Sequence, residues 1–309
     1  MRRAVLATLL ALSSACGSTP REATPQSPAA APSPTQSSAP TPTPAPTPDQ
    51  SVIDLGRAMD HVRALGAEIG YRQAGTEGDA LAARYISEQV ELIGWQVAEQ
   101  KFALPQGGES SNVIGKPPGF DERAPYLIVG AHRDSLRGPG ANDNATGVAL
   151  ALEIARAVDA RAAALPVVFI AFGAEERQPA NGRPHHIGSR YFVSLMSEQQ
   201  KQNLVSLVNI DMVGRGDLIT CGHMSVGPTE GTERCVRLAK ELGIPAKERV
   251  TPDWSDNGSF LTNGMNASWL WTGDDPCCIH SPRDTFDRVR SADVERSGRL
   301  ALAIVRSYS

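Results

Sequence analysis

Residues 125–134 read Pro-Tyr-Leu-Ile-Val-Gly-Ala-His-Arg-Asp, an apolar run that ends in two metal-ligand types of residue, His132 and Asp134. Short runs rich in Val, Ile and Leu are typical of buried strands in a parallel sheet. Open α/β sheets bind ligands outside the carboxyl ends of their strands, so the chemistry of this chain should lie where such runs end. The stretch therefore predicts an α/β fold with a functional site at one sheet edge.

Three more apolar runs lead to acids or to an imidazole in the same way. They are residues 165–174 before Glu175 and Glu176, residues 204–210 before Asp211, and residues 266–271, which lead through a polar loop to His280. We expect these side chains to converge with His132. Two imidazoles and several carboxylates at one sheet edge are what a binuclear zinc hydrolase needs.

A glycine-rich loop, residues 138–144 (Gly-Pro-Gly-Ala-Asn-Asp-Asn), supplies a further carboxylate just before a helix. Glycine lets the backbone approach a metal centre closely. The two oxygens of Asp143 can bridge two ions roughly 3.5–4 Å apart, the separation typical of two-metal hydrolases. The alternative is that Asp143 caps the helix, although Asn144 or Thr146 could do so instead.

Two pairs of polar residues have a spacing that suits metal hydrolysis. The strand period of two places His132 and Asp134 on one side of the backbone, where the carboxylate can accept a hydrogen bond from the far imidazole nitrogen. The side chains of the neighbours Glu175 and Glu176 diverge, so one can bind metal while the other acts as a base. Each pair alone also occurs as an ordinary surface pair or acidic loop.

Apolar residues recur at helical spacing between the strands. The pattern predicts a helix over residues 82–93 that ends near Gly94, and another over residues 148–158, with further helices over residues 230–242 and 292–308. An edge strand is expected near residues 95–104. Strands that alternate with helices predict a three-layer α/β/α sandwich with a mixed, mostly parallel central sheet.

The N-terminus resembles an export signal. Residues 1–16 contain two arginines followed by an apolar stretch that is too short to span a bilayer as a helix. Residues 12–17, Leu-Ser-Ser-Ala-Cys-Gly, resemble a bacterial lipoprotein cleavage box in which Cys16 carries the lipid. A plain signal peptide cleaved near Cys16 is the alternative. We therefore expect a secreted protein, or a lipoprotein attached to the outer face of a bacterial membrane through Cys16 alone.

Residues 17–50 consist almost entirely of Ser, Thr, Pro, Ala and Gln, which predicts a disordered tether. Residues 51–309 then suit one α/β domain, which we expect to be monomeric. The net charge of −4, without a basic cluster, argues against nucleic-acid binding. Four cysteines in an exported domain make a disulfide plausible, but leave its pairing open; the cysteines are Cys221, Cys235, Cys277 and Cys278.

The motifs jointly resemble the co-catalytic dizinc aminopeptidase family, secreted leucyl-type exopeptidases that share a zinc-exopeptidase fold with glutamate carboxypeptidase, the transferrin receptor ectodomain and glutaminyl cyclase. The matching segments, in the order of the family, are residues 74–78, 130–135, 140–147, 172–176, 188–192, 209–214 and 280–285. The likeness extends from Asp54 to the C-terminus.

The resemblance implies two Zn²⁺ ions per chain and a role for each residue of the site. Asp143 would bridge both ions, His132 and Asp211 would complete one, Glu176 and His280 would complete the other, Glu175 would be the general base, and Asp134 would be the hydrogen-bond partner of His132. The implied substrates are peptides with a free N-terminus. No core ligand of the family is missing from this chain.

The chain also departs from the family. Many members carry Tyr just before the last metal-binding His, where this chain has Ile279, and Asn257 replaces a histidine that precedes a Phe in the family. Residues 177–187 form a longer link than usual and could cover part of the cleft. We expect the remaining histidines to lie away from the site; these are His61, His185, His186 and His223.

The sequence therefore predicts a zinc-dependent aminopeptidase in which Glu175 takes the proton of the attacking water and passes it to the leaving amine. Three alternatives remain. They are a glutaminyl cyclase, a dipeptidase or carboxypeptidase of the same fold, and a non-catalytic binding module on a surface tether.

Overall fold

The computed structural model describes residues 52–160, 163–176, 185–273 and 275–308. All of these belong to one unit, Pro48–Ser309. The predictions for residues 1–50, the signal and the tether, lie outside the described residues. Within the described part of the chain, no helix has the length and apolar character needed to cross a membrane.

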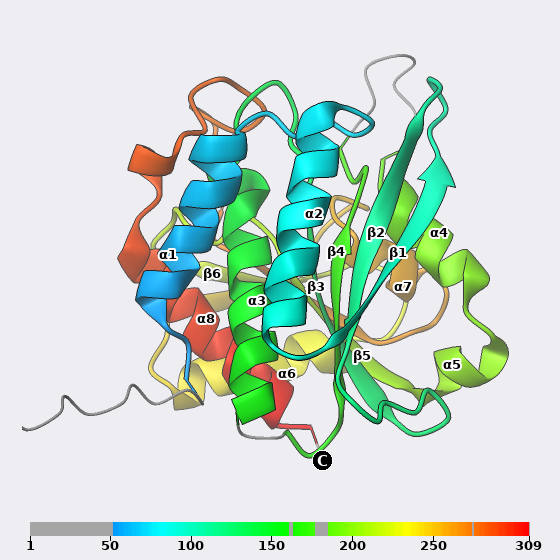
Figure 1. Ribbon diagram of the computed structural model, residues 1–309. Helices are drawn as coiled ribbons and strands as arrows, with labels where there is room; N and C mark the ends of the chain where they lie inside the picture. The colour runs from blue at the N-terminus through cyan, green and yellow to red at the C-terminus, as the bar shows by residue number, and fades with distance from the viewer. Residues whose placement is uncertain (1–51, 161–162, 177–184, 274, 309) are drawn as a thin grey trace, which may run out of the picture. The chain divides into compact units, whose positions relative to one another are not determined.

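The described residues form one eight-stranded sheet in the order β1-β2-β4-β3-β5-β8-β6-β7 (Figure 1). The strands are β1 (Gln96–Ala103), β2 (Glu109–Lys116), β3 (Tyr126–His132), β4 (Val167–Phe172), β5 (Leu204–Ile210), β6 (Ile219–His223), β7 (Ala246–Val250) and β8 (Ala267–Trp271). The central neighbours β4, β3, β5 and β8 pair in parallel, whereas β1 and β2 join as an antiparallel hairpin and β6 pairs antiparallel with β8. The prediction of a mixed, mostly parallel sheet is confirmed.

Helices cover both faces of the sheet. One face packs against α1 (Leu55–Arg63), α2 (Glu77–Leu92), α3 (Thr146–Ala160), α6 (Glu230–Glu241) and α8 (Ser291–Arg306), and the other against α4 (Ile187–Leu195) and α7 (Asn257–Leu261). Short helical segments complete the chain: η1 (Ala64–Ile69), η2 (Ala141–Ala145), α5 (Glu198–Asn203) and η3 (Phe286–Arg288). The three-layer sandwich is therefore confirmed.

The strand period of two divides the core between the two faces. In β3, Leu127 and Val129 join the cluster under α1, α2 and α3, while Ile128 joins the cluster with Phe260 of α7. Both faces of the strand are buried, which is why its sequence is a continuous apolar run. The core thus fixes β3, and with β3 the position of the residues that follow it.

The residues at the helix ends agree with the sequence pattern. Thr76 accepts a hydrogen bond from the backbone N–H of Asp79 and caps α2, and the chain leaves this helix through Gly94 at a φ of 92°. The four helices expected from periodicity are all present as α2, α3, α6 and α8.

Two disulfides are present in the structure. Cys221 of β6 pairs with Cys235 of α6, and the neighbours Cys277 and Cys278 pair in the loop before His280. The sequence left this pairing open, because only the packing of α6 on the sheet brings Cys235 beside β6.

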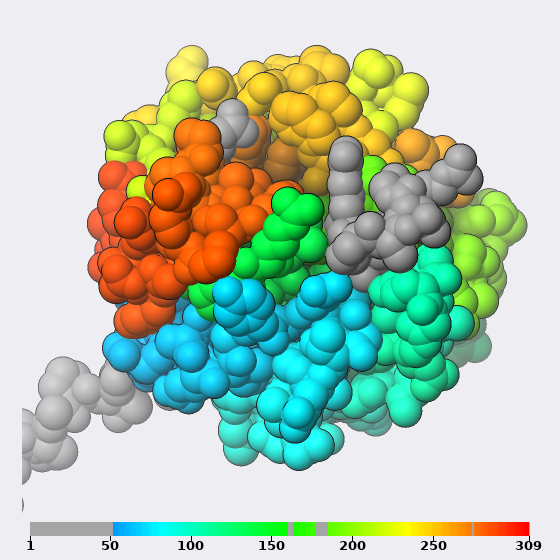
Figure 2. All heavy atoms as spheres, turned by 90° about the horizontal axis from the view of Figure 1, so that it is seen from above, coloured from blue at the N-terminus to red at the C-terminus, as the bar shows by residue number. Residues whose placement is uncertain are grey.

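The carboxyl ends of the central parallel strands meet at one edge of the sheet. Figure 2 looks down on this edge, where the glycine-rich loop (green) and the loop that holds His280 (orange) lie side by side. A Cβ at Gly138 would lie 2.0 Å from the carbonyl oxygen of Ser281, so only glycine permits this approach. The loops after β3 and β8 are thereby brought together.

Candidate metal centre

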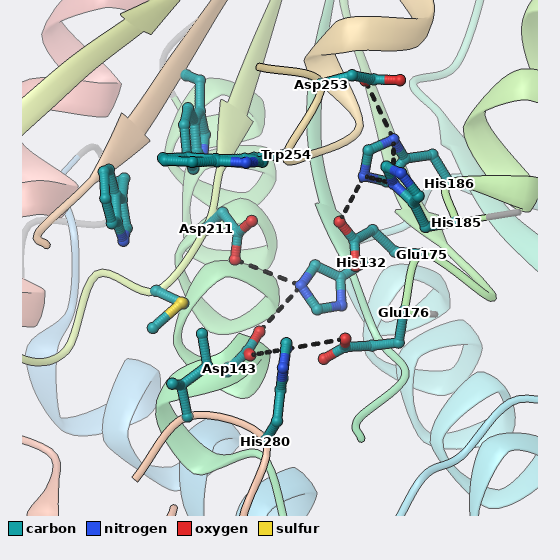
Figure 3. A pocket seen from close by; sticks show the side chains of 14 residues that line it. His132, Asp143, Glu175, Glu176, His185, His186, Asp211, Asp253, Trp254 and His280 are labelled. Atoms are coloured by element: carbon teal, nitrogen blue, oxygen red, sulfur yellow. Dashed lines mark hydrogen bonds and ion pairs between the residues drawn. The ribbon is translucent and has the colours of Figure 1, made fainter. Parts of the chain in front are cut away.

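A cavity of about 400 Å³ opens at this edge. It is lined by His132, Asp143, Glu175, Glu176, His185, His186, Asp211, Met212, Asp253, Trp254, Trp269, Trp271, Ile279 and His280. Polar side chains gather on one side of the cavity and indole rings on the other (Figure 3). The five residues predicted as metal ligands and the predicted base all line this one cavity.

His132, the last residue of β3, lies at the centre of the polar side and is 2% exposed. Its Nε2 is 3.2 Å from Oδ1 of Asp143 and 3.3 Å from Oδ1 of Asp211, which follows β5 (Figure 3). Oδ2 of Asp211 accepts a hydrogen bond from the Ser255 hydroxyl at 2.7 Å. One imidazole and two carboxylates thus form a buried group.

His280 forms a second group with the other oxygen of Asp143. Its Nε2 is 3.3 Å from Oδ2 of Asp143 and 3.0 Å from Oε2 of Glu176. The two oxygens of Asp143 therefore face different imidazoles. The role of these residues as ligands stays a prediction, but the structure brings all five together in the grouping that the sequence resemblance implied.

The separations within both groups fit a bound zinc ion. Zn–N and Zn–O bonds of about 2.0–2.1 Å in a tetrahedral arrangement place neighbouring ligand atoms about 3.3 Å apart. The four separations between imidazole nitrogen and carboxylate oxygen lie between 3.0 and 3.3 Å. Imidazole nitrogens and carboxylate oxygens are also among the ligands that zinc takes in proteins, and catalytic zinc sites combine the two.

The electrostatics of the cavity favour positive charge. Burial raises the pKa of Glu176 well above its ordinary value, and the neighbouring Asp143 carboxylate adds to this rise. Burial alone would lower the pKa of His280, but hydrogen bonds to Asp143 and Glu176 raise it to about 11. Burying several carboxylates close together costs free energy unless cations balance their charge. The cavity therefore attracts protons or divalent metal ions.

Asp134 holds the backbone of the paired glutamates. Its carboxylate accepts hydrogen bonds from the backbone N–H of Glu175 at 3.0 Å and of Glu176 at 3.2 Å. One of its oxygens lies 3.7 Å from Nδ1 of His132, and its backbone carbonyl oxygen is nearer to that nitrogen, at 3.2 Å. Asp134 therefore connects the imidazole of one group of predicted ligands with the backbone of the other group.

Two buried side chains that the sequence did not single out hold the glycine-rich loop. Asp284 accepts hydrogen bonds from the backbone N–H groups of Asn142 and Asp143, at 2.8 and 2.9 Å. Arg72, fully buried, donates to the carbonyl of Arg133 and to that of Gly140. Both contacts join segments far apart in the sequence, so local patterns give no signal of them.

Several non-glycine residues at the site have left-handed backbone conformations. They are Ala174, His186, Met212 and His280, with φ between 51° and 60°. Such conformations are costly for residues with a Cβ and persist where the surrounding structure holds them. Three of them lie at or directly beside a predicted site residue, where they turn the chain sharply at the cavity.

The expectation that His185 and His186 lie away from the site is wrong. Both line the cavity, and Nε2 of His186 is 2.9 Å from Oε1 of Glu175. His61 and His223 do lie elsewhere: His61 contacts the Tyr85 hydroxyl, and His223 pairs with Glu248. The expected cover over the cleft was residues 177–187, and of these residues 177–184 lie outside the described residues.

The side of the cavity opposite the acids is apolar. Met212, Trp269, Trp271 and Ile279 form one cluster, in which the two indole rings stack at 5.0 Å with an angle of 4° between their planes. Trp254 stands edge-on to Trp271 at 6.2 Å and is 44% exposed. Ile279, at the position of the family tyrosine, contributes apolar surface here and carries no hydroxyl group.

The chain belongs to peptidase family M28, whose model matches residues 112–305. Aminopeptidase YwaD of Bacillus subtilis is 28% identical over 208 residues, which are 63% of this chain and 44% of YwaD. Leupeptin-inactivating enzyme 1 of Streptomyces exfoliatus is 28% identical over 261 residues, 76% of this chain and 57% of that protein. The chain therefore spans about half the length of these curated relatives.

The fold is also that of a solved zinc aminopeptidase, BSAP from Bacillus subtilis. The TM-score is 0.74 at 18% identity, and the superposition covers 82% of this chain and 94% of that structure. At this identity the similarity establishes the fold alone.

Proposed function

We propose that this protein is a zinc aminopeptidase that hydrolyses the N-terminal peptide bond of peptides. The observation that carries the proposal is the placement of Asp143, whose two oxygens face the imidazoles of His132 and His280 at 3.2 and 3.3 Å. A carboxylate shared in this way is suited to bridge two metal ions. Membership of a peptidase family supports the reaction class, and so do two relatives, one named as an aminopeptidase and the other as a leupeptin-inactivating enzyme.

Two zinc ions would be held by this chain's own residues, with Asp143 common to both. His132 and Asp211 would hold one, and Glu176 and His280 the other. When bound, the ions supply Lewis acidity, which polarises a substrate carbonyl and lowers the pKa of water towards about 7. Asp134 and Asp284 keep the backbone beneath these ligands in place through their hydrogen bonds.

Glu175 is the proposed general base. A carboxylate oxygen of Glu175 lies within 4.8 Å of ligand atoms of both His132 and Asp211, and the residue itself is 6% exposed. Glu175 would take a proton from the attacking water and donate it to the nitrogen of the leaving amine. The neighbouring Glu176 faces His280 instead, which supports the proposal that one glutamate binds metal and the other acts as the base.

The apolar wall of the cavity indicates the side chain that a substrate would present. Met212, Trp271 and Ile279 offer a surface that a large apolar or aromatic N-terminal residue would cover. Burial of such a side chain contributes roughly 1.5–3 kcal/mol. We therefore expect leucine, methionine and phenylalanine at the substrate N-terminus to be preferred over acidic residues, which the carboxylates of the site repel.

A panel of peptides and aminoacyl amides tests the function of the purified full-length protein. We expect release of N-terminal leucine from free peptides, no cleavage of N-acetylated peptides, and loss of activity with a chelator followed by recovery with Zn²⁺. Equal cleavage of blocked peptides would contradict an aminopeptidase. Ring closure of N-terminal glutamine without release of an amino acid would instead identify a glutaminyl cyclase.

We also infer that the protein is exported. The arginine-containing apolar start of residues 1–16 supports export, and the disulfides Cys221–Cys235 and Cys277–Cys278 are typical of proteins in an oxidising compartment. Cell fractionation of a bacterial host should find the protein outside the cytoplasm. Membrane attachment that disappears in Cys16→Ser would identify a lipoprotein, and unchanged release of both forms would identify a secreted protein.

A further inference from the structure

His186 is fixed beside Glu175 through the backbone as well as the side chain. The backbone N–H groups of His186, Ile187 and Gly188 donate in turn to the carbonyls of Glu175, Ala174 and Gly173, at 2.7, 2.9 and 3.0 Å. The segment that starts α4 therefore runs antiparallel along the segment that ends in the proposed base. His186 is 1% exposed, so its ring has little freedom to leave this position.

The imidazole of His186 lies between two carboxylates. Its Nε2 is 2.9 Å from Oε1 of Glu175, and its Nδ1 is 3.2 Å from Oδ1 of Asp253 (Figure 3). Arg190 of α4 in turn donates to Oδ2 of Asp253 at 2.6 Å. The ring of His185 packs at right angles to that of His186, with centroids 3.9 Å apart.

This arrangement restricts one oxygen of the Glu175 carboxylate. A glutamate side chain has three rotatable bonds, and the hydrogen bond between its backbone N–H and Asp134 fixes only the backbone. The donor at Nε2 of His186 holds Oε1, which leaves the second oxygen to receive a proton. A displacement of a reacting group by about 1 Å can lower a rate by about 10²-fold, so such a contact matters for turnover.

We propose that His186 is the positioning residue of Glu175, and that Asp253 fixes the orientation of the His186 ring. The inference rests on the proposed peptidase function, because it assigns a role to the partner of the proposed base. It concerns a residue near the end of the long link of residues 177–187, which the sequence analysis expected to lie away from the site. In this role His186 acts through Glu175 and not directly on a metal ion or on the substrate.

Two amide substitutions separate the contacts of the two ring nitrogens. In His186→Gln the amide nitrogen reaches the place of Nε2 and can still donate to Glu175, whereas in His186→Asn it reaches only the place of Nδ1, near Asp253. We expect kcat for leucine amide hydrolysis to stay within about 3-fold of the unsubstituted protein in His186→Gln. In His186→Asn and His186→Leu, kcat should fall about 10²-fold, with KM and bound zinc nearly unchanged.

His223 provides matched controls away from the cavity. It is also a buried histidine whose Nε2 meets a glutamate, at 3.0 Å from Oε1 of Glu248. His223→Gln and His223→Asn should both retain kcat. If His186→Leu fails to fold, the kcat values of His186→Gln and His186→Asn still test the positioning role. Equal kcat in these two variants, or a change in KM without a change in kcat, would overturn the proposed role.

A measurement without turnover separates this inference from the function on which it rests. In protein labelled with ¹⁵N-histidine, the Nε2 resonance of His186 should shift in Glu175→Gln, while the resonances of His223 stay in place. A chain that lacks amidase activity but shows this shift would refute the peptidase function and support the contact. An unchanged His186 resonance would overturn the positioning role in an active or an inactive protein.

Discussion

The two halves of the proposed metal centre share Asp143 but are built in different ways. The inner half is His132 and Asp211, which end or follow strands β3 and β5 and are 2% and 5% exposed. The outer half is Glu176 and His280, and the side chain of His280 is 41% exposed on a loop beyond β8. Sheet hydrogen bonds and the core hold the inner half, whereas loop packing holds the outer half. The comparison indicates that the inner half should bind metal more stably.

Loss of the shared residue should affect both halves at once and have the largest effect. In Asp143→Ala, each imidazole loses the carboxylate oxygen that lies 3.2 or 3.3 Å away. We expect kcat/KM for leucine amide to fall at least about 10⁴-fold, the scale seen when a central catalytic group is removed. Metal analysis should find both ions depleted, and full activity with normal metal content would contradict the bridging role.

Substitution of the proposed base should leave both halves intact. Glu175→Gln removes the proton acceptor without removing a predicted ligand, so kcat should fall about 10²–10⁴-fold while zinc content stays unchanged. Glu248→Gln, an exposed glutamate paired with His223, is the control and should behave like the unsubstituted protein. Near-normal turnover of the Glu175 variant would exclude its role as base.

The difference between the halves can be measured directly by partial removal of metal. His280→Ala should lose the outer ion and keep the inner one, whereas His132→Ala should lose the inner ion from a buried position and lose stability as well, because it leaves Asp211 and Asp143 without their shared partner. Chelator titration of the unsubstituted protein should show the exposed side released first. If both ions were lost together at every chelator concentration, the predicted difference in metal affinity between the two halves would be contradicted.

A smaller effect is expected from the carboxylate beneath the shared residue. Asp284 accepts hydrogen bonds from the backbone N–H groups of Asn142 and Asp143 but is not a predicted metal ligand. In Asp284→Asn an amide N–H replaces one acceptor, so zinc affinity should fall about 10–100-fold, as for other outer partners of metal sites. Calorimetric titration of the metal-free protein measures this, with the exposed Asp287→Asn as control. Equal zinc affinities in Asp284→Asn and Asp287→Asn would contradict the supporting role of Asp284.

His61, which lies away from the metal-binding cavity, shows the opposite pKa shift to the imidazoles of the site and affects stability instead of activity. Burial, with help from Arg57, lowers its pKa from 6.5 to about 4. The unfolded chain therefore takes up a proton at a higher pH than the folded chain, and the free energy of unfolding falls by about 3 kcal/mol as the pH drops from 6.5 towards 4. Urea unfolding at pH 7.5 and pH 4 should show a weaker pH dependence in His61→Gln. If the pH dependence of stability were the same in His61→Gln and in the unsubstituted protein, the lowered pKa of His61 would be contradicted.

The contrast between the halves also explains what the sequence could predict. His132 and Asp211 follow continuous apolar runs, so the strands and their convergence follow from the sequence pattern. His280 lies nine residues beyond β8, across a polar loop, so the pattern predicted only that it lies at this sheet edge, and its pairing with Glu176 came from the resemblance to the peptidase family. The pattern thus predicts residues on the sheet better than residues on loops.

Other parts of the site depend on contacts that no local pattern reveals. Arg72 reaches the carbonyl of Gly140, 68 residues away, and Asp284 reaches a backbone N–H 141 residues away. His186 was expected outside the site because it ends a polar link rather than an apolar run. Its contact with Glu175 arises from the antiparallel pairing of residues 186–188 with residues 173–175.

The most direct measurement of the central claim is anomalous diffraction at the zinc edge from crystals of the zinc-loaded protein. We predict two peaks, one beside His132 and Asp211 and one beside Glu176 and His280, with the Asp143 carboxylate between them. A single peak, or strong peaks elsewhere with none at Asp143, would contradict this prediction.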